Sequence, residues 1–245
     1  MGYEWQLVAL MIVAVLITGI SKSGFAGGVG VVAVPLISLK ASPAFAAAIM
    51  LPLLIIMDVF SLRAWWRQSV GRVLWLMLPP AALGVVVGYL TYGTFSDDLL
   101  KVVLGVFSIL FGCWGLLNPL RERGMPDGVG ALCGGIAGFT SFIAHAGGPP
   151  LNFYLLQKSL GKEAFLGTAV VFLAAINLVK LAPYGLLGLL TLENLFVAMS
   201  LTPVAWLGVH LGLVIQKRIA GELFFRIALG LLILLGIRLV VDGGW

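Results

Sequence analysis

Two glycine-rich breaks decide the fold of this chain: Ser21-Lys22-Ser23-Gly24-Phe25-Ala26-Gly27-Gly28 and Ala144-His145-Ala146-Gly147-Gly148-Pro149-Pro150. Each break interrupts an apolar run. The apolar pieces that follow, 25–39 and 149–157, are shorter than the roughly 20 residues that cross a bilayer as helix. Broken backbone at membrane depth persists only where protein or a water-filled cavity satisfies its hydrogen bonds. Both breaks are therefore expected to lie against protein or a cavity inside a membrane.

The composition requires contact with lipid. Of the 245 residues, 61% are hydrophobic and only 10% are charged, whereas a soluble domain has about 25% charged residues. A globule with so few charges could not cover its surface, so a polytopic protein with a lipid bilayer around it is predicted. The net charge of +5 is scattered singly or in pairs, which argues against a nucleic-acid partner.

The two halves of the chain repeat each other. A shift of 120 residues places Gly27-Gly28 on Gly147-Gly148 and Ala44-Phe45 on Ala164-Phe165. With a gap of four residues, so that the shift becomes 124, three further residues of the first half match three of the second. Pro79, Gly84 and Gly88 then fall on Pro203, Gly208 and Gly212. The predicted fold is an all-α membrane protein of two repeats, 1–117 and 128–245, joined by a cytoplasmic linker, 118–127. Each repeat is a broken, re-entrant helical hairpin followed by three transmembrane helices.

The apolar runs from which this fold is predicted lie at about 5–21, 25–39, 44–66, 71–93, 98–117, 128–144, 149–157, 164–186, 192–215 and 223–241.

Basic residues indicate the orientation. If each broken pair returns to its starting side, one face carries Arg67, Arg72, Arg121, Arg123, Lys158, Lys162, Lys217, Arg218 and Arg226. The opposite face carries fewer basic residues, Lys40, Lys101 and Arg238, beside several acidic ones. The positive-inside rule then places the first face in the cytoplasm and both termini on the other side. Because each repeat has five segments, the second repeat is inverted, a design found in secondary transporters.

The hairpin tips are expected to meet near the middle of the membrane and to form a ligand site there. A half-helix beginning at each tip would aim amide donors and a positive dipole end at that site, which suits a small anion. Glycine lets a ligand approach these amides with no Cβ in the way. The glycines concerned are Gly27, Gly28, Gly147 and Gly148.

Two ionisable side chains stand out at the tips. Lys22 adds a positive charge next to the first tip, and an intramembrane lysine is a functional candidate by default. The alternative is a lysine that extends to the membrane surface. His145 occupies the second tip and could carry a proton coupled to transport or bind the anion. The alternative is a neutral histidine bonded to exposed backbone at the break.

Other polar side chains complete the predicted substrate-binding set. Hydroxyl and amide groups near the tips could donate hydrogen bonds to the ligand: Ser21, Ser23, Thr140, Ser141, Asn152 and Asn177. For the serines, packing between membrane helices is an equal alternative. Four other polar residues are expected to be peripheral: Asp58, Arg63, Lys180 and His210.

No enzyme motif is present in the sequence. The two histidines lie far apart and neither is near a cysteine pair, so no metal site is expected. Cys113 and Cys133 both lie in apolar runs, where they are expected to pack as small hydrophobes. A phosphate-binding G-x-x-x-x-G-K-[ST] loop is also absent from the sequence. We therefore expect neither an enzyme nor a cofactor.

The two breaks resemble those of the sulfite exporter TauE/SafE family. The resemblance rests on Gly24-Phe25-Ala26-Gly27-Gly28-Val29-Gly30 leading into Val34-Pro35-Leu36, and on Gly138-Phe139-Thr140-Ser141 followed by Gly147-Gly148-Pro149-Pro150-Leu151. It extends through Phe225-Arg226 and the last apolar run. It implies export, without ATP, of sulfite or a small organosulfonate such as sulfoacetate from the bacterial cytoplasm. It also implies a location in the inner membrane.

Three functions remain open at this point. The first is a secondary transporter of a small sulfur-containing anion, working by alternating access around the two tips. The second is an importer, or a transporter of another anion or sulfur compound. The third is a sensor or scaffold subunit that transports nothing. The glycine-rich helices also offer close-packing surfaces, so a homodimer stays open.

Overall fold

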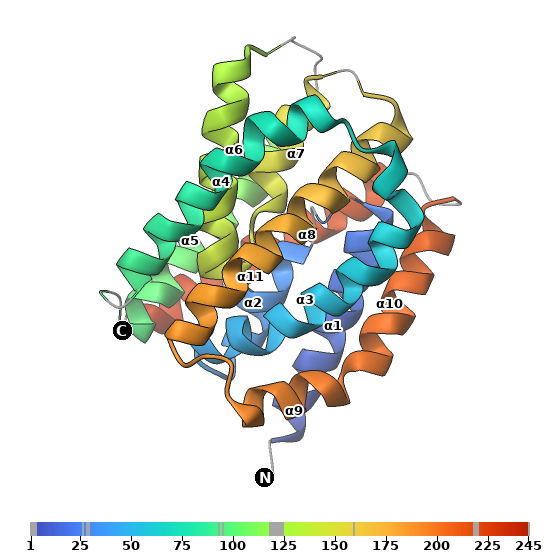
Figure 1. Cartoon of the computed structure of the whole chain (residues 1–245). Helices are drawn as coiled ribbons and strands as arrows, with labels where there is room; N and C mark the ends of the chain where they lie inside the picture. The colour runs from blue at the N-terminus through green and yellow to red at the C-terminus, as the bar shows by residue number, and fades with distance from the viewer. Residues whose placement is uncertain are drawn as a thin grey trace.

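The structure is a computed structural model that describes residues 4–25, 27, 30–92, 94, 96–117, 125–158, 160–217 and 221–244. In this part of the chain every regular element is helical, which confirms the predicted all-α fold (Figure 1). The elements are α1 (Trp5–Gly24), η1 (Gly30–Val32), α2 (Ala33–Ser38), α3 (Pro43–Trp65), η2 (Trp66–Gln68), α4 (Gly71–Tyr92), α5 (Asp97–Leu117), α6 (Asp127–Ala144), α7 (Gly148–Leu156), α8 (Lys162–Leu186), α9 (Leu192–Ser200), α10 (Thr202–Ile215) and α11 (Gly221–Gly243).

Among the described residues, five helices are long and apolar enough to cross a membrane: α1, α3 with η2, α4, α6 and α8. The predicted multi-pass membrane protein is therefore confirmed. One expected span, 192–215, is not a single straight helix, because α9 and α10 meet at a 47° bend. Pro203 explains the bend: it lies in the first turn of α10, where its missing N–H is tolerated, whereas inside a continuous helix it would remove a hydrogen bond.

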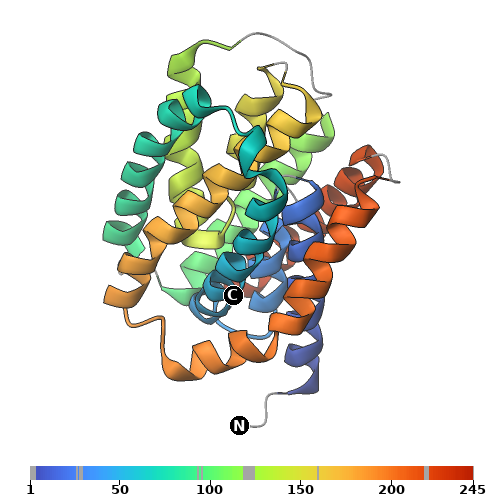
Figure 2. The ribbon, with the colours of Figure 1, turned by 45° about the vertical axis from the view of Figure 1, so that its right-hand side comes forward.

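Each glycine-rich break separates a long helix from a short one that packs back against it. α1 contacts α2 across the first break, and α6 contacts α7 across the second. The turns between α3 and α4 and between α7 and α8 lie at one end of the molecule, and α1 begins at the other (Figures 1 and 2). This is the arrangement expected if each break returns the chain toward its starting side.

At the end of the molecule that carries Arg72, Lys158 and Lys162 (the basic end), polar contacts join separate segments of the chain. Asp127 lies 3.1 Å from Lys158 Nζ and 3.4 Å from Arg72 Nη2. Lys162 Nζ donates to the carbonyl oxygen of Gln216 at 3.1 Å. Three of the predicted basic residues, Arg121, Arg123 and Arg218, and most of the linker, 118–124, lie outside the described residues.

The two halves contact each other through matching surfaces. α1 packs along α10, and α6 packs along α4; α3 packs against α8, and α5 against α11. If each helix is replaced by its counterpart in the other half (α1 by α6, α3 by α8, α4 by α10 and α5 by α11), the same set of helix pairs results. The glycines matched in the sequence take part: a Cβ at Gly208 would meet α1 at Gly19, and one at Gly84 would meet α6 at Gly135 and Phe139. The inverted repeat stays a prediction, which these equivalent contacts support.

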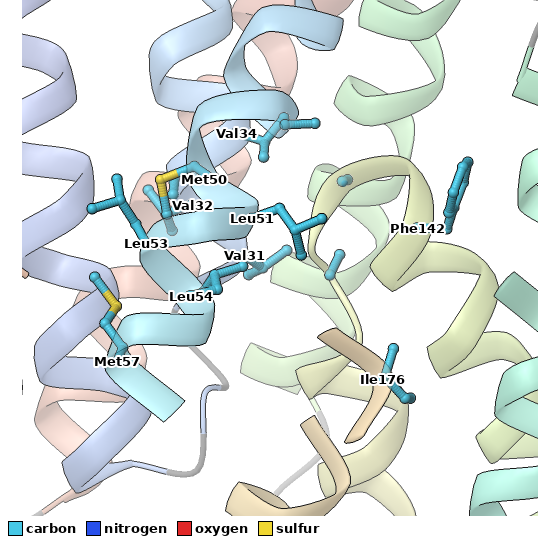
Figure 3. Close-up of a cluster of buried hydrophobic side chains, with 14 of the residues drawn as sticks. Val31, Val32, Val34, Met50, Leu51, Leu53, Leu54, Met57, Phe142 and Ile176 are labelled. Carbon is cyan, nitrogen blue, oxygen red and sulfur yellow. The ribbon is translucent and has the colours of Figure 1, made fainter. Parts of the chain in front are cut away.

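An apolar cluster surrounds the region where the breaks meet. Figure 3 shows side chains of η1, α2 and α3 together with Phe142 of α6 and Ile176 of α8, all members of one buried cluster. Of these, Leu51 and Leu53 on α3 are fully buried. Close packing of this kind holds the few polar groups described below at fixed positions.

The α4–α6 contact gives a first testable prediction. A Cβ at Gly138 would overlap the Ala81 backbone, so Gly138→Ala is expected to destabilise the protein by about 1–3 kcal/mol, the usual cost of overpacking. The measurement is an unfolding titration in mixed micelles. Gly185→Ala is the matched control, because a Cβ there meets nothing within 4 Å. Equal stability of the two variants would contradict the proposed close packing.

Candidate functional site

The two breaks meet at a small cavity. Its volume is about 20 Å³, which is room for about one water molecule. α1 and the first break contribute to its wall, as do α3, α6, the second break, α7 and α8. The lining residues are Thr18, Lys22, Gly27, Gly30, Leu54, Ser141, His145, Gly148, Leu173 and Asn177.

Lys22 reaches this cavity from α1 and forms a buried ion pair. Its Nζ lies 2.8 Å from Asp58 Oδ1, and the two side chains are 4% and 5% exposed. The other carboxylate oxygen, Asp58 Oδ2, accepts a hydrogen bond from Asn177 Nδ2 at 2.7 Å. Asp58 therefore joins a cation of the first half to an amide of the second. The alternative that Lys22 extends to the membrane surface is wrong.

A second buried amine, Lys180, bonds to two residues of the cavity wall, Ser141 and His145. Its Nζ has three partners: the Ser141 carbonyl oxygen at 3.0 Å, Ser141 Oγ at 3.0 Å and His145 Nδ1 at 2.7 Å. Lys180 is completely buried. Lys180 follows Asn177 by three residues on α8, just under one turn of helix, which places both side chains on the same face of the helix.

His145 links the second break to α3 and α8. Its Nε2 lies 2.9 Å from the Ala47 carbonyl oxygen. A carbonyl oxygen only accepts, so Nε2 carries the proton and donates it. If Lys180 also donates, Nδ1 must be unprotonated and the imidazole neutral. His145 ends α6 in the left-handed region, with φ of 53°, an uncommon conformation for a residue other than glycine.

The first turn of α7 presents the positive end of a helix dipole to the cavity. Gly148 is the first residue of this nine-residue helix and lines the cavity. Because Pro149 and Pro150 have no N–H, Gly148 is the residue of this turn whose amide can face a ligand. Gly27 also lines the cavity, with φ of +69° and no side chain between its backbone and the cavity.

The structure brings six of the predicted site residues to the cavity and leaves five others out of its lining. The six are Lys22, Gly27, Ser141, His145, Gly148 and Asn177. The five are Ser21, Ser23, Thr140, Gly147 and Asn152. Gly28 lies outside the described residues.

The predicted hydroxyl groups mainly stabilise the hairpins. Ser21 Oγ accepts from the Gly30 amide across the first break. Ser23 Oγ donates to Val209 on α10, which is the packing alternative. Thr140 Oγ1 donates to the Ala146 carbonyl oxygen and so closes the second tip.

Two other predicted residues belong to α7 and its N-cap. Gly147 is the N-cap of α7. A Cβ there would lie 3.0 Å from the Ala137 carbonyl oxygen and from Ser141 Cβ, so this glycine allows the second break to pack closely on α6. Asn152 is buried, and its Oδ1 has no partner among the described residues.

Two expectations from the sequence are wrong. Asp58 and Lys180 were expected to be peripheral, yet they are 4% and 0% exposed and hydrogen-bond directly to cavity residues. Asp58 lies about two turns before the end of α3 and so about 10 Å from it along the helix axis, too deep to anchor the helix at the surface. The sequence did contain a signal for both residues, because a single charged side chain within an apolar run is a candidate functional residue.

The polar groups in and around the cavity are mainly hydrogen-bond donors. Two amines, Lys22 and Lys180, and the neutral imidazole of His145 lie near the single carboxylate of Asp58. In the described part of the chain, no three His, Cys, Asp or Glu side chains are grouped closely enough to hold a metal ion. Amine, amide and hydroxyl donors around a small space fit an oxyanion, because such groups form charge-assisted hydrogen bonds with its oxygens.

The model of one protein family, the sulfite exporter TauE/SafE family, matches residues 10–239. This range includes both breaks and every residue of the cavity. No curated protein and no solved structure matches the chain.

Proposed function

Because the chain belongs to the sulfite exporter TauE/SafE family, we propose that it is a secondary transporter of a small sulfur-containing anion. Sulfite and short organosulfonates such as sulfoacetate are the substrates that we expect. The observation that carries the proposal is the cavity between the two breaks, where Lys22, His145 and Asn177 converge. A sulfonate or sulfite group presents three oxygens, which suit several donors arriving from different helices.

Lys22 and the α7 terminus are the proposed anchors for these oxygens. The Lys22 ammonium has three donors, and the ion pair with Asp58 occupies one of them. Gly148 faces the same cavity with the positive end of α7 behind it. Asn177 and Ser141 add neutral groups that define the direction of approach.

Transport requires the helices around the cavity to separate. A space of about 20 Å³ holds about one water molecule, so an anion of several heavy atoms enters only when the walls move. We propose that the two halves, as inverted repeats, open the cavity alternately to the two sides. The Lys22–Asp58–Asn177 contacts join the two halves and must rearrange in that motion.

The orientation proposed from the sequence places the basic end in the cytoplasm. This end carries Arg72, Lys158 and Lys162, and the positive-inside rule assigns it to the cytoplasmic side of a bacterial inner membrane. Both termini then face the periplasm. In an exporter, the gradient of the anion itself, or of an ion coupled to it, drives the anion outward.

The proposal is tested by flux in proteoliposomes. Purified protein is reconstituted with sulfite, thiosulfate, sulfoacetate or taurine inside, and release is compared with that from protein-free vesicles. We expect sulfite and sulfoacetate to leave faster than taurine, because the ammonium group of taurine would meet the Lys22 ammonium in the cavity.

The alternatives give different outcomes in this assay. Preferential movement of thiosulfate, or of an anion without sulfur, would assign another substrate. Movement of none of the four solutes would contradict the proposed transport function and favour a sensor or scaffold subunit. The direction of transport is tested separately by imposing an anion gradient in each sense.

A further inference from the structure

Lys180 has a set of hydrogen bonds that serves two protonation states equally well. As an ammonium, it donates to the Ser141 carbonyl oxygen, to Ser141 Oγ and to His145 Nδ1. As a neutral amine, it donates to the carbonyl oxygen and to His145 Nδ1, and it accepts from the Ser141 hydroxyl, which rotates to suit. No heavy atom has to move between these states, and His145 keeps the same neutral tautomer in both.

The charges around Lys180 decide which state is favoured. Lys22 and Asp58 form one ion pair, which contributes no net charge. Of the ion pairs among the described residues, none involves Lys180. A protonated Lys180 therefore gives the cluster one uncompensated positive charge, and burying such a charge away from water is costly.

Among the described residues, few titratable or charged side chains face Lys180 from the surrounding helices. α1 contributes Lys22, α3 contributes Asp58 and the break after α6 contributes His145. On α8 itself, the Tyr184 hydroxyl donates to the Phe142 carbonyl oxygen, and its ring lies 6.0 Å from that of His145. From α4, Tyr92 stacks edge-on against Phe142. The ionisable side chains at the end of α7, Tyr154 and Lys158, bond to Asp127 at the basic end.

We propose that Lys180 is the site of a proton that binds together with the anion, one proton for each single negative charge. This inference rests on the proposed transport function and specifies its coupling ion. A proton from the aqueous solution, released by hydronium or buffer acid, adds to the Lys180 amine when the anion enters the cavity. The anion compensates the new ammonium, so the loaded cluster is neutral. His145 accepts a hydrogen bond from Lys180 in both states and positions it.

Because binding of the proton and binding of the anion are thermodynamically linked, the pH dependence of the anion affinity measures this coupling. If one proton binds with each anion, the anion dissociation constant rises about tenfold for each pH unit in the range where the empty site is deprotonated. Reciprocally, the anion favours protonation by the same factor. The probe is methanesulfonate, whose single charge does not change with pH, so every proton taken up belongs to the protein.

The experiment is calorimetric titration of the purified full chain with methanesulfonate in buffers that differ in ionisation enthalpy. We expect uptake of one proton per anion. In Lys180→Arg, whose guanidinium stays charged, we expect the anion to bind with no proton uptake and a dissociation constant independent of pH. In Lys180→Met, which tests the same point if arginine prevents folding, we expect weaker binding and again no uptake. Lys162→Met, an exposed position on the same helix, should behave as the parent protein.

Three outcomes separate the inference from the function on which it rests. Binding of methanesulfonate without proton uptake by the parent protein overturns the role of Lys180 and leaves the transport function standing. Uptake of one proton that persists in Lys180→Arg or Lys180→Met assigns the proton to another group and also overturns it. Failure of methanesulfonate to bind, together with no sulfite flux in proteoliposomes, overturns the transport function itself.

Discussion

Replacement of Asp58 by asparagine is expected to destabilise the protein by about 3–5 kcal/mol, the cost of leaving a buried charge without its partner. The Lys22 ammonium is only 4% exposed and lies 2.8 Å from Asp58. Asparagine keeps the shape of the side chain and can still accept from Asn177, so the effect reports the lost charge. The measurement is the free energy of unfolding from SDS titration in mixed micelles.

The double variant Lys22→Gln/Asp58→Asn is the control for this prediction. It replaces the ion pair by a neutral pair of similar shape that can keep one hydrogen bond, and no charge is left unpaired. Exchange of a buried ion pair for neutral groups is often tolerated, so the double variant should be more stable than Asp58→Asn. If Asp58→Asn unfolds at the same SDS fraction as the parent protein, the buried ion pair does not exist in the membrane protein.

A methyl group at Gly27 is expected to slow transport. Gly27 has φ of +69°, and an added Cβ would lie 2.5 Å from Cδ1 of Leu173, another residue that lines the cavity. The contact is with the end of a flexible side chain, so Leu173 must turn within the cavity wall. The anion would then bind less well, and the flux of Gly27→Ala should fall by about tenfold. The measurement is the initial rate of sulfite release from proteoliposomes.

Gly188→Ala is a matched control for the backbone strain of Gly27→Ala. The φ of Gly188 is +67°, and a Cβ there meets nothing within 4 Å. Gly188→Ala therefore has the same left-handed strain, about 1–2 kcal/mol, without an obstruction in the cavity. We expect Gly188→Ala to lose only the stability that this strain costs, and Gly27→Ala alone to lose flux. Equal flux in the two variants would show that the first break does not line the transport route.

The sequence was sufficient to predict the fold around the breaks. Gly27 and Gly147-Gly148 mark the two places where long helices give way to short ones, and the structure has its helix ends there. Lys22 and His145, distant in sequence, reach the same cavity as expected. The bend before Pro203 was missed because the apolar run continues through it, although proline in the first turn of a new helix was a visible signal.

The site was only partly predictable, for geometric reasons. Consecutive residues on a helix point about 100° apart, so Lys22 and Ser23 cannot both face the cavity. Ser23 faces α10 instead. Asp58 and Lys180 lie within regular helices and far from any glycine-rich break. Nothing in the local sequence shows that their sides of α3 and α8 face each other, because that depends on how the helices pack.

The most direct test of the proposed anion site is anomalous diffraction from crystals grown with selenite, a pyramidal oxyanion with the shape of sulfite. We expect one selenium peak between Lys22 and Gly148, with oxygens within hydrogen-bonding distance of the Lys22 ammonium. Selenium bound only outside this cavity, or no ordered selenium at a concentration that saturates transport, would contradict the assignment of the two breaks as the substrate site.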